Sequence, residues 1–219
     1  MDTLALLQKH CPLYHFDSRE SCSPCSLNEY VSTHKFVHNS TVVGQVQPTN
    51  RKTLLLHYFL FFEKDLGMGC CGSAVDAHKY DMEQLTVEVS NGGTVLGVCY
   101  QPHGIKEHYW LRSDSDLKTV LRGNAQAKAY VSKGKHAVYP IEGRIWRYGG
   151  VANDVCMHPR SQQMRVELPS DKVLAEDYID SVFRSINRRM HHVSGDNRPC
   201  VPLRTARTRM VFGGLGSAK

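Results

Sequence analysis

An alternating stretch over residues 76–89 constrains the fold of this chain more than any other part of the sequence. It opens with turn-forming residues, and Leu85, Val87 and Val89 then place an apolar side chain at every second position. Successive side chains of a strand point to opposite faces, so this period is the one expected of a strand with one buried face. The sequence therefore predicts a half-buried strand here.

Further strand signals flank this stretch. Asn91-Gly92-Gly93 is a strong signal for a tight hairpin turn, and residues 94–100 supply the antiparallel partner strand. Upstream, residues 53–62 are almost continuously apolar, which favours a strand buried on both faces.

Two other stretches are predicted to be loops. Residues 39–52 contain Gly44 and Pro48, so we expect a loop with at most a brief strand. Residues 63–77 contain several glycines and are expected to form a long loop that leads into the alternating strand.

Two carboxylates and a histidine are predicted to converge at the entry of the alternating strand. Asp81 and Glu83 share the parity of its apolar residues, so both should lie on one face. His78 breaks that parity and must reach the same point from the preceding turn. These ligands suit a divalent cation, and we expect calcium, magnesium or manganese rather than zinc. The alternative is that all three are solvated residues at a sheet edge.

Three further residues are candidates for ligand binding. The hairpin should return His103 close to His78, and His136 follows Gly134, which permits close approach of the backbone. Asp154 is available as another acid, in a glycine-rich stretch predicted to be a loop. For both candidate histidines, a buried imidazole hydrogen-bonded to backbone is the competing interpretation.

The eight cysteines are expected to be reduced thiols of an intracellular protein, because the N-terminus shows no secretion signal. No apolar run approaches the roughly 20 residues of a membrane-spanning helix. The CxxC motif at 22–25 could form a zinc site with Cys70 and Cys71, although no second CxxC is present. Cysteine–histidine catalysis is a further alternative, with Cys70, Cys71 or Cys99 as nucleophile and His136 as base.

The C-terminal part is predicted to form a long helix and a tail. Residues 170–190 begin with the N-cap residue Ser170 and carry apolar residues at every fourth position, as expected of a helix packed on a sheet. We therefore expect one domain over residues 1–193, including this helix, and a basic, flexible tail over residues 194–219.

Positive charge is concentrated in the same part of the chain. The net charge is +6, and seven arginines between residues 184 and 209 face a single acid, Asp196. They are candidates for binding a polyanion such as nucleic acid or an anionic membrane surface, and a solubilising segment is the alternative. These arginines are Arg184, Arg188, Arg189, Arg198, Arg204, Arg207 and Arg209.

The motifs around the candidate cation ligands resemble those of two known families. Residues 78–83, with the pattern His-x-x-Asp-x-Glu, are similar to the core motif of the necrosis- and ethylene-inducing-like proteins and to a strand of the vacuolar protein sorting 62-like family. Residues 130–140 resemble the second family's Gly-Ser-His-Ala-x-Tyr-Pro signature, and residues 11–20 resemble its opening segment. The chain departs from the first pattern at Met82, where that family has tryptophan.

The resemblance implies a mainly β fold, an antiparallel β-sandwich with peripheral helices, and a divalent cation held by His78, Asp81 and Glu83. With His103 and His136 nearby, we expect a cation-dependent, non-enzymatic module that binds a polar or anionic ligand such as a lipid headgroup or a glycan. A metal-dependent hydrolase built on the same residues remains an alternative. So does a structural or nucleic-acid-associated protein that uses its arginine-rich segment.

Overall fold

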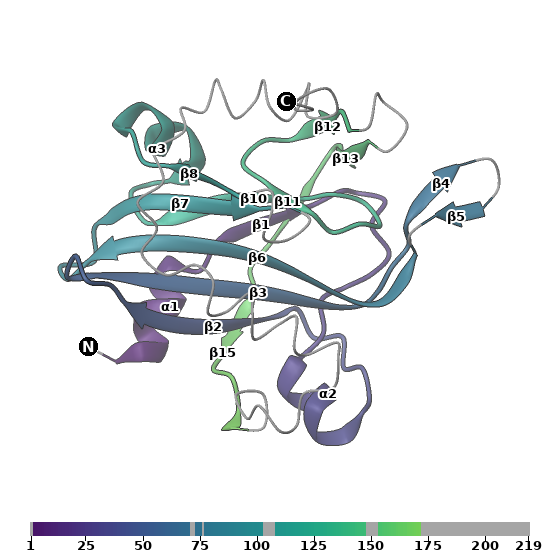
Figure 1. The fold of residues 1–219 in the computed structure, drawn as a ribbon, viewed down its shortest axis with the longest axis horizontal. Coiled ribbons are helices and arrows are strands. Elements are labelled where there is room, and N and C mark those ends of the chain that lie inside the picture. Colours follow the sequence, from purple (N-terminus) through teal and green to yellow (C-terminus); the bar gives the residue numbers. More distant parts are fainter. Residues whose placement is uncertain (1, 71–72, 76, 103–107, 148–152, 172–219) are drawn as a thin grey trace, which may run out of the picture.

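The computed structural model describes residues 2–70, 73–75, 77–102, 108–147 and 153–171. Over these residues the protein is mainly β, with two larger sheets and three short helices (Figure 1). The helices are α1 (Thr3–His10), α2 (Leu27–Thr33) and α3 (Asp114–Val120). No helix in the described part of the chain is long and apolar enough to cross a membrane.

The larger sheet has six strands in the order β15-β2-β3-β6-β7-β8. Its strands are β2 (Thr41–Pro48), β3 (Thr53–Asp65), β6 (His78–Ser90), β7 (Val95–Gln101), β8 (Tyr109–Leu111) and β15 (Arg165–Glu167). The two 13-residue strands, β3 and β6, pair antiparallel along their whole length. The strands predicted from the apolar run and from the alternating stretch are thus confirmed. The expectation that the second strand is half-buried is wrong, because its polar residues Gln84, Thr86 and Glu88 are buried as well and find hydrogen-bonding partners such as His57 and Arg112.

The predicted hairpin at residues 91–93 joins β6 to β7. The Gly93 N–H donates to the Ser90 carbonyl over 2.8 Å. Gly93 has a φ of +80°, which glycine adopts without the steric cost of a side chain. The resulting register places Gln101 opposite Gln84.

Both stretches expected to be loops contain strands. Strand β2 covers most of residues 39–52. Its Gly44 does not break the strand, because the missing side chain leaves room for Val166 and Leu7, which a Cβ would meet at 2.9 and 3.0 Å. In residues 63–77, β3 continues and the short strands β4 (Met68–Cys70) and β5 (Ser73–Val75) pair with each other. Glycine is often a turn signal, whereas in β2 it permits close packing.

The second sheet is mixed rather than antiparallel. Its strands are β1 (Leu13–Phe16), β9 (Leu121–Arg122), β10 (Gln126–Val131), β11 (Val138–Tyr139) and β14 (Arg160–Gln162). Strand β1 lies between β10, to which it is parallel, and β14, to which it is antiparallel. In the larger sheet, β15 is likewise parallel to β2. The antiparallel expectation is wrong for these pairs, because turn signals specify only strands that follow each other in the sequence.

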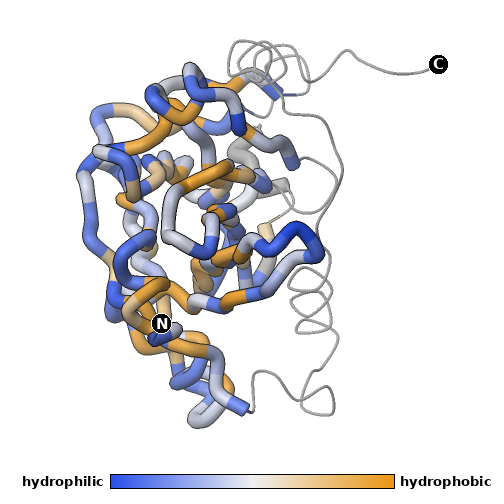
Figure 2. Tube along the Cα trace, turned by 90° about the vertical axis from the view of Figure 1, so that its left-hand side faces the viewer, coloured by the Kyte–Doolittle hydropathy of each residue, from blue (hydrophilic) through white to orange (hydrophobic). Residues whose placement is uncertain are grey.

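One hydrophobic core lies between the two sheets. It includes Tyr14 and Val131 from the smaller sheet and Leu85 from the larger one. Helix α1 contributes Leu7, whose carbonyl accepts a hydrogen bond from the Tyr58 hydroxyl over 2.8 Å. Figure 2 shows hydrophobic positions separated by hydrophilic ones along the trace, as expected of strands with one face on this core.

The opposite face of the larger sheet carries a second cluster, which Tyr30 of helix α2 forms with Phe61 and Met82. Two short strands, β12 (Gly143–Ile145) and β13 (Asp154–Cys156), form a separate pair. The predicted helix over residues 170–190, apart from its first two residues, lies outside the described residues. The same holds for the tail 194–219 and the seven candidate arginines.

Candidate functional site

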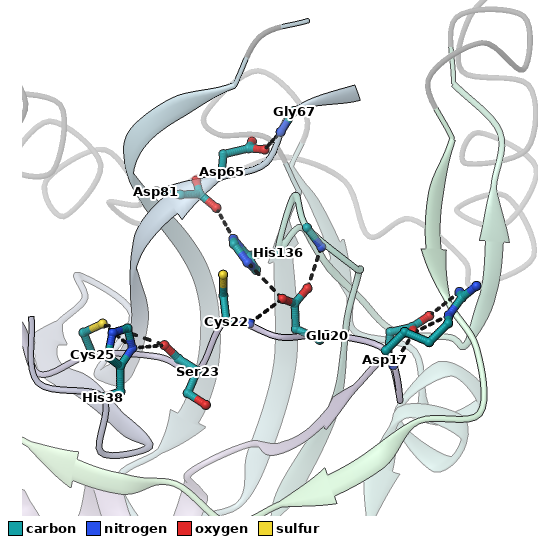
Figure 3. Close-up of polar contacts among 12 residues, drawn as sticks. Asp17, Glu20, Cys22, Ser23, Cys25, His38, Asp65, Gly67, Asp81 and His136 are labelled. Carbon is teal, nitrogen blue, oxygen red and sulfur yellow. Dashed lines mark hydrogen bonds and ion pairs between the residues drawn. The ribbon is translucent and has the colours of Figure 1, made fainter. Parts of the chain in front are cut away.

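Three segments that are distant in the sequence meet at one end of the sheets (Figure 3). Because β1 and β10 are parallel neighbours, the chain leaves both strands at the same end, where the Asp17 N–H donates to the Val131 carbonyl over 3.3 Å. The turn after β10, residues 132–137, is closed by a 3.0 Å hydrogen bond between its first and last residues. The Leu66 N–H, just after β3, donates to the Gly134 carbonyl of that turn over 2.8 Å. The end of β3 also pairs with the beginning of β6, so the beginning of β6 lies at the same end of the sheets.

His136 stands at the centre of this meeting point and is fully buried. Its Nδ1 lies 2.9 Å from Asp81 Oδ2. Its ring stacks on Phe62 with 3.7 Å between centroids and 8° between planes. Phe62 and Asp81 are opposite each other on β3 and β6, so the pairing of the two long strands provides both contacts.

Glu20 and Cys22 lie on the other side of the imidazole from Asp81 (Figure 3). The Glu20 carboxylate accepts hydrogen bonds from the backbone N–H groups of Cys22, at 2.7 Å, and of Gly134. Glu20 Oε1 is 3.8 Å from His136 Nε2, too far for a hydrogen bond, and Nε2 makes none within the described residues. One donor atom from each of Glu20, Cys22 and His136 lies within 4.8 Å of the others, so these three residues could hold a metal ion.

Charged neighbours determine the protonation of the site. Burial lowers the pKa of His136, but the hydrogen bond to Asp81 and the contacts with Cys22 and Glu20 outweigh it and raise the pKa to about 11. Burial raises the pKa of Glu20, yet His136 and the N–H groups of Gly134 and Cys22 lower it overall. The contacts among the described residues therefore favour the protonated form of His136 and the ionised form of Glu20.

The carboxylates predicted from the alternating stretch lie as expected on one face of β6. Asp81 and Glu83 are both buried and pair with core-lining residues of β3. The backbone of His78 begins strand β6 itself, rather than belonging to the preceding turn. The side chain of His78 and the whole of His103 lie outside the described residues. A cation site at His78, Asp81 and Glu83 therefore stays a prediction.

Asp154 lies in a different cluster. It is buried on strand β13, although that region was expected to be a loop. The Tyr139 hydroxyl donates to its Oδ2. Lys135 Nζ is 3.3 Å from Oδ1, and Arg147 Nε is 3.7 Å from Oδ2. Lys135 and Arg147 thus balance the charge of Asp154, in a cluster that is distinct from the contacts of His136.

The sequence did not identify Glu20 or Cys22 as part of this site. The CxxC motif groups Cys22 with Cys25, but Cys25 Sγ lies beside His38 Nδ1, at 3.2 Å. Glu20 contacts Gly134, 114 residues away, through the parallel pairing of β1 and β10, for which no local signal exists. The family resemblance is one signal that could have linked them. Glu20 and His136 each lie in a segment that resembles the vacuolar protein sorting 62-like family.

A pocket of ≈ 380 Å³ adjoins the His136 turn and is called the basic pocket below. Its lining residues are Arg19, Leu66, Gly67, Lys133, Gly134, Arg144, Asn153 and Val155. Arg19 is held by Asp17, with Nε 3.0 Å from Oδ1 and a terminal nitrogen 2.9 Å from Oδ2. Burial of Asp17 opposes its ionisation, but these bonds and two backbone N–H groups lower its pKa to about 2. Neither Lys133 nor Arg144 forms an ion pair with a carboxylate of the described residues.

No family model matches the sequence, and no curated protein matches it. Among solved structures, one described as a toxin fold for microbial attack and plant defence is similar at a TM-score of 0.49 and 12% identity, over 96% of this chain and 88% of the other. NLPPya in complex with mannosamine is similar at a TM-score of 0.48 and 11% identity, over 99% and 92% of the two chains.

A third similar structure is necrosis and ethylene inducing protein 2 from the causal agent of witches' broom disease of cocoa. Its TM-score is 0.42 at 14% identity, over 75% of this chain and 70% of the other. Structures of the necrosis-inducing kind are thus similar at low identity, which assigns no family to this chain. The resemblance to the vacuolar protein sorting 62-like family stays a prediction.

Proposed function

We propose that this protein is a non-enzymatic module that binds a small polar ligand through an anionic group, in the basic pocket. The observation that carries the proposal is the unbalanced positive charge of the pocket wall. Lys133 and Arg144 are exposed and have no carboxylate partner among the described residues, while Arg19 is oriented by Asp17. Two cations without a carboxylate partner and one oriented guanidinium around the same cavity favour a phosphate or carboxylate.

The size and lining of the pocket suit a ligand no larger than a sugar phosphate or a lipid headgroup. Its volume of ≈ 380 Å³ is at the small end of the roughly 300–1,000 Å³ typical of ligand pockets. Leu66 and Val155 offer apolar surface to the body of such a ligand, and the Asn153 side chain adds a polar group.

The lining favours binding over catalysis. Among the described residues of the pocket wall, none is a histidine, a cysteine, a serine or an acid, so the amine of the exposed Lys133 is the one described group that could act as a nucleophile or general base. A divalent cation at His78, Asp81 and Glu83, as expected from the sequence, would add positive charge at this end of the fold. Binding in the basic pocket does not require that cation. The ligand affinity is therefore measured both with and without chelator.

The first experiment is calorimetric titration of the full chain with glucose 6-phosphate, glucose, inorganic phosphate and mannosamine. We expect the phosphorylated sugar to bind most tightly and inorganic phosphate more weakly. Affinity should fall as salt rises, because exposed charges are screened. Mannosamine, the ligand in one of the similar structures, carries an amine and should bind worse than glucose 6-phosphate in a basic pocket.

The second experiment replaces the pocket cations. Lys133→Gln with Arg144→Gln should weaken binding of glucose 6-phosphate about tenfold, corresponding to roughly 1.4 kcal/mol. Lys35→Gln with Arg122→Gln removes the same charges from exposed positions outside the pocket and should leave the affinity nearly unchanged. Equal losses in the two double variants would reject the pocket and leave only a general effect of net charge.

A further inference from the structure

We propose that Glu20, Cys22 and His136 form a binding site for a thiophilic divalent cation such as Zn²⁺. Its three ligands differ from those of the cation expected at His78, Asp81 and Glu83, and the two sites share only Asp81, which would orient His136 here and ligate the cation there. The proposed site is independent of the basic pocket, so either proposal can fail without the other.

The donor set and its spacing carry the proposal. A carboxylate, a thiol and an imidazole are the three ligand types that Zn²⁺ uses in proteins, and the thiol disfavours calcium and magnesium. Bonds of about 2.0–2.3 Å in a tetrahedral site separate neighbouring ligand atoms by roughly 3.3–3.8 Å. Glu20 Oε1 and His136 Nε2 are already 3.8 Å apart, and all three donor atoms lie within 4.8 Å.

His136 supplies a polar atom without a hydrogen-bonding partner, aimed at the other two donors. Its side chain is 0% exposed, and Nε2 makes no hydrogen bond to any described residue. Figure 3 shows Cys22 and Glu20 on the same side of the imidazole. A buried ring nitrogen without a partner is costly in a folded protein. A metal ion bound there would satisfy it by displacing the Nε2 proton of His136 and the thiol proton of Cys22 to solvent.

The surroundings hold the ligands in place. Asp81 accepts from Nδ1 of His136, which is the carboxylate–histidine arrangement that orients an imidazole toward a metal. Phe62 fixes the plane of the ring by stacking. Two backbone N–H groups, from Cys22 and Gly134, fix the Glu20 carboxylate. Asp81 thus acts as a positioning residue rather than a ligand.

One coordination position is left for water or a small ligand. The Glu20 side chain is only 3% exposed, whereas Cys22 is partly buried, and both residues line a pocket of ≈ 200 Å³ together with Ser18, Ser23 and Arg160. Three protein ligands and one open position are typical of zinc sites that exchange their fourth ligand.

Two other uses of Cys22 fit less well. With His136 and Asp81 it has the order of a nucleophile, a base and an orienting acid, but the neighbouring Glu20 carboxylate would repel a thiolate unless a cation lay between them. A chelate by the CxxC motif would need Cys25, whose sulfur lies beside His38 instead.

The test uses the full chain, reduced and stripped of metal, titrated with Co²⁺ and then with Zn²⁺. We expect a near-ultraviolet thiolate-to-cobalt band that Zn²⁺ abolishes and that excess Ca²⁺ or Mg²⁺ leaves intact. Cys22→Ser should remove one equivalent of this band and weaken Zn²⁺ binding at least about 100-fold, more than loss of an outer partner does. Asp81→Asn should keep the band while weakening Zn²⁺ binding about 10–100-fold.

The controls are the other cysteine of the motif and the other carboxylate of β6. Cys25→Ser and Glu83→Gln should both retain the band and the Zn²⁺ affinity. If the band survives Cys22→Ser, or if Cys25→Ser removes it, the proposed ligand set is wrong. Should Cys22→Ser fail to fold, as judged by its melting curve, Glu20→Gln gives the same test through the loss of Zn²⁺ affinity.

Discussion

His57 and His136 are both fully buried, yet their surroundings shift their pKa values in opposite directions. His57 lies in the middle of β3, where Nδ1 is 3.0 Å from the Thr86 hydroxyl and Nε2 is 3.0 Å from Gln47 Oε1. Burial lowers its pKa to about 4. His136, at the end of the sheets, faces carboxylates, and its pKa rises to about 11 although burial opposes this.

The difference shows that burial alone does not determine the charge of a histidine. In the centre of the sheet, neutral partners satisfy His57, and it serves the fold. At the end of the sheets, Asp81 and Glu20 bring negative charge to His136, and this charge stabilises the protonated imidazole. The charge of the neighbours distinguishes the two environments.

The largest expected effect comes from replacing each histidine by glutamine in chelator at pH 7. His136→Gln should lower the free energy of unfolding by about 3–5 kcal/mol, because it leaves Asp81 and Glu20 without the cation between them. His57→Gln keeps a neutral hydrogen-bonding side chain and should cost about 1 kcal/mol. Urea unfolding measures both, and equal losses would break the comparison.

A smaller effect is expected from acid. The folded-state pKa of His57 is depressed, so between about pH 6.5 and pH 4 the unfolded chain binds a proton that the folded chain does not. Stability from this group is therefore present above pH 6.5 and is lost as pH falls to 4, by as much as about 3 kcal/mol.

Urea unfolding across this pH range checks the acid prediction. His57→Gln should show a shallower loss of stability than the wild type, while His158→Asn, at an exposed position, should follow the wild type. Parallel curves for His57→Gln and the wild type would mean that His57 takes up its proton without unfolding.

The smallest effect concerns the backbone of the His136 turn. Gly134 has a φ of +73°, and a Cβ there would meet Leu66 Cβ at 3.4 Å, whereas Gly123, at φ +59°, faces open space. Gly123→Ala should cost about 1–2 kcal/mol from backbone strain alone. Gly134→Ala should cost slightly more, and still less than His136→Gln. Thermal melting of the two alanine variants measures the difference, and a larger loss in Gly123→Ala would contradict it.

Local patterns in the sequence predicted the parts of the fold that local physics determines. The apolar run at 53–62, the alternation after residue 80 and the turn at 91–93 each specify structure within a few residues, and all three are present. The alternation also placed Asp81 and Glu83 correctly on one face, because the side-chain period of a strand is fixed.

The candidate site was harder to predict because its parts come together only through tertiary structure. Glu20 reaches His136 because β1 lies beside β10, and the hydrophobic core rather than any turn specifies that pairing. Spacing along the chain groups Cys22 with Cys25 in the CxxC motif, whereas in the fold Cys25 lies beside His38 and Cys22 beside Glu20 and His136. Prediction therefore succeeded for β6 and failed for the segment after β1.

The position of β1 also governs the order in which the protein can assemble. This strand pairs on one side with β10 and on the other with β14, so residues 13–16 must wait for residues 160–162 before both edges are bonded. During synthesis, the N-terminal segment leaves the ribosome long before its partners exist. We therefore expect folding to be slow and late, because it is dominated by non-local contacts. We also expect that cutting the chain between β8 and β10 yields two fragments that fold only when they are together.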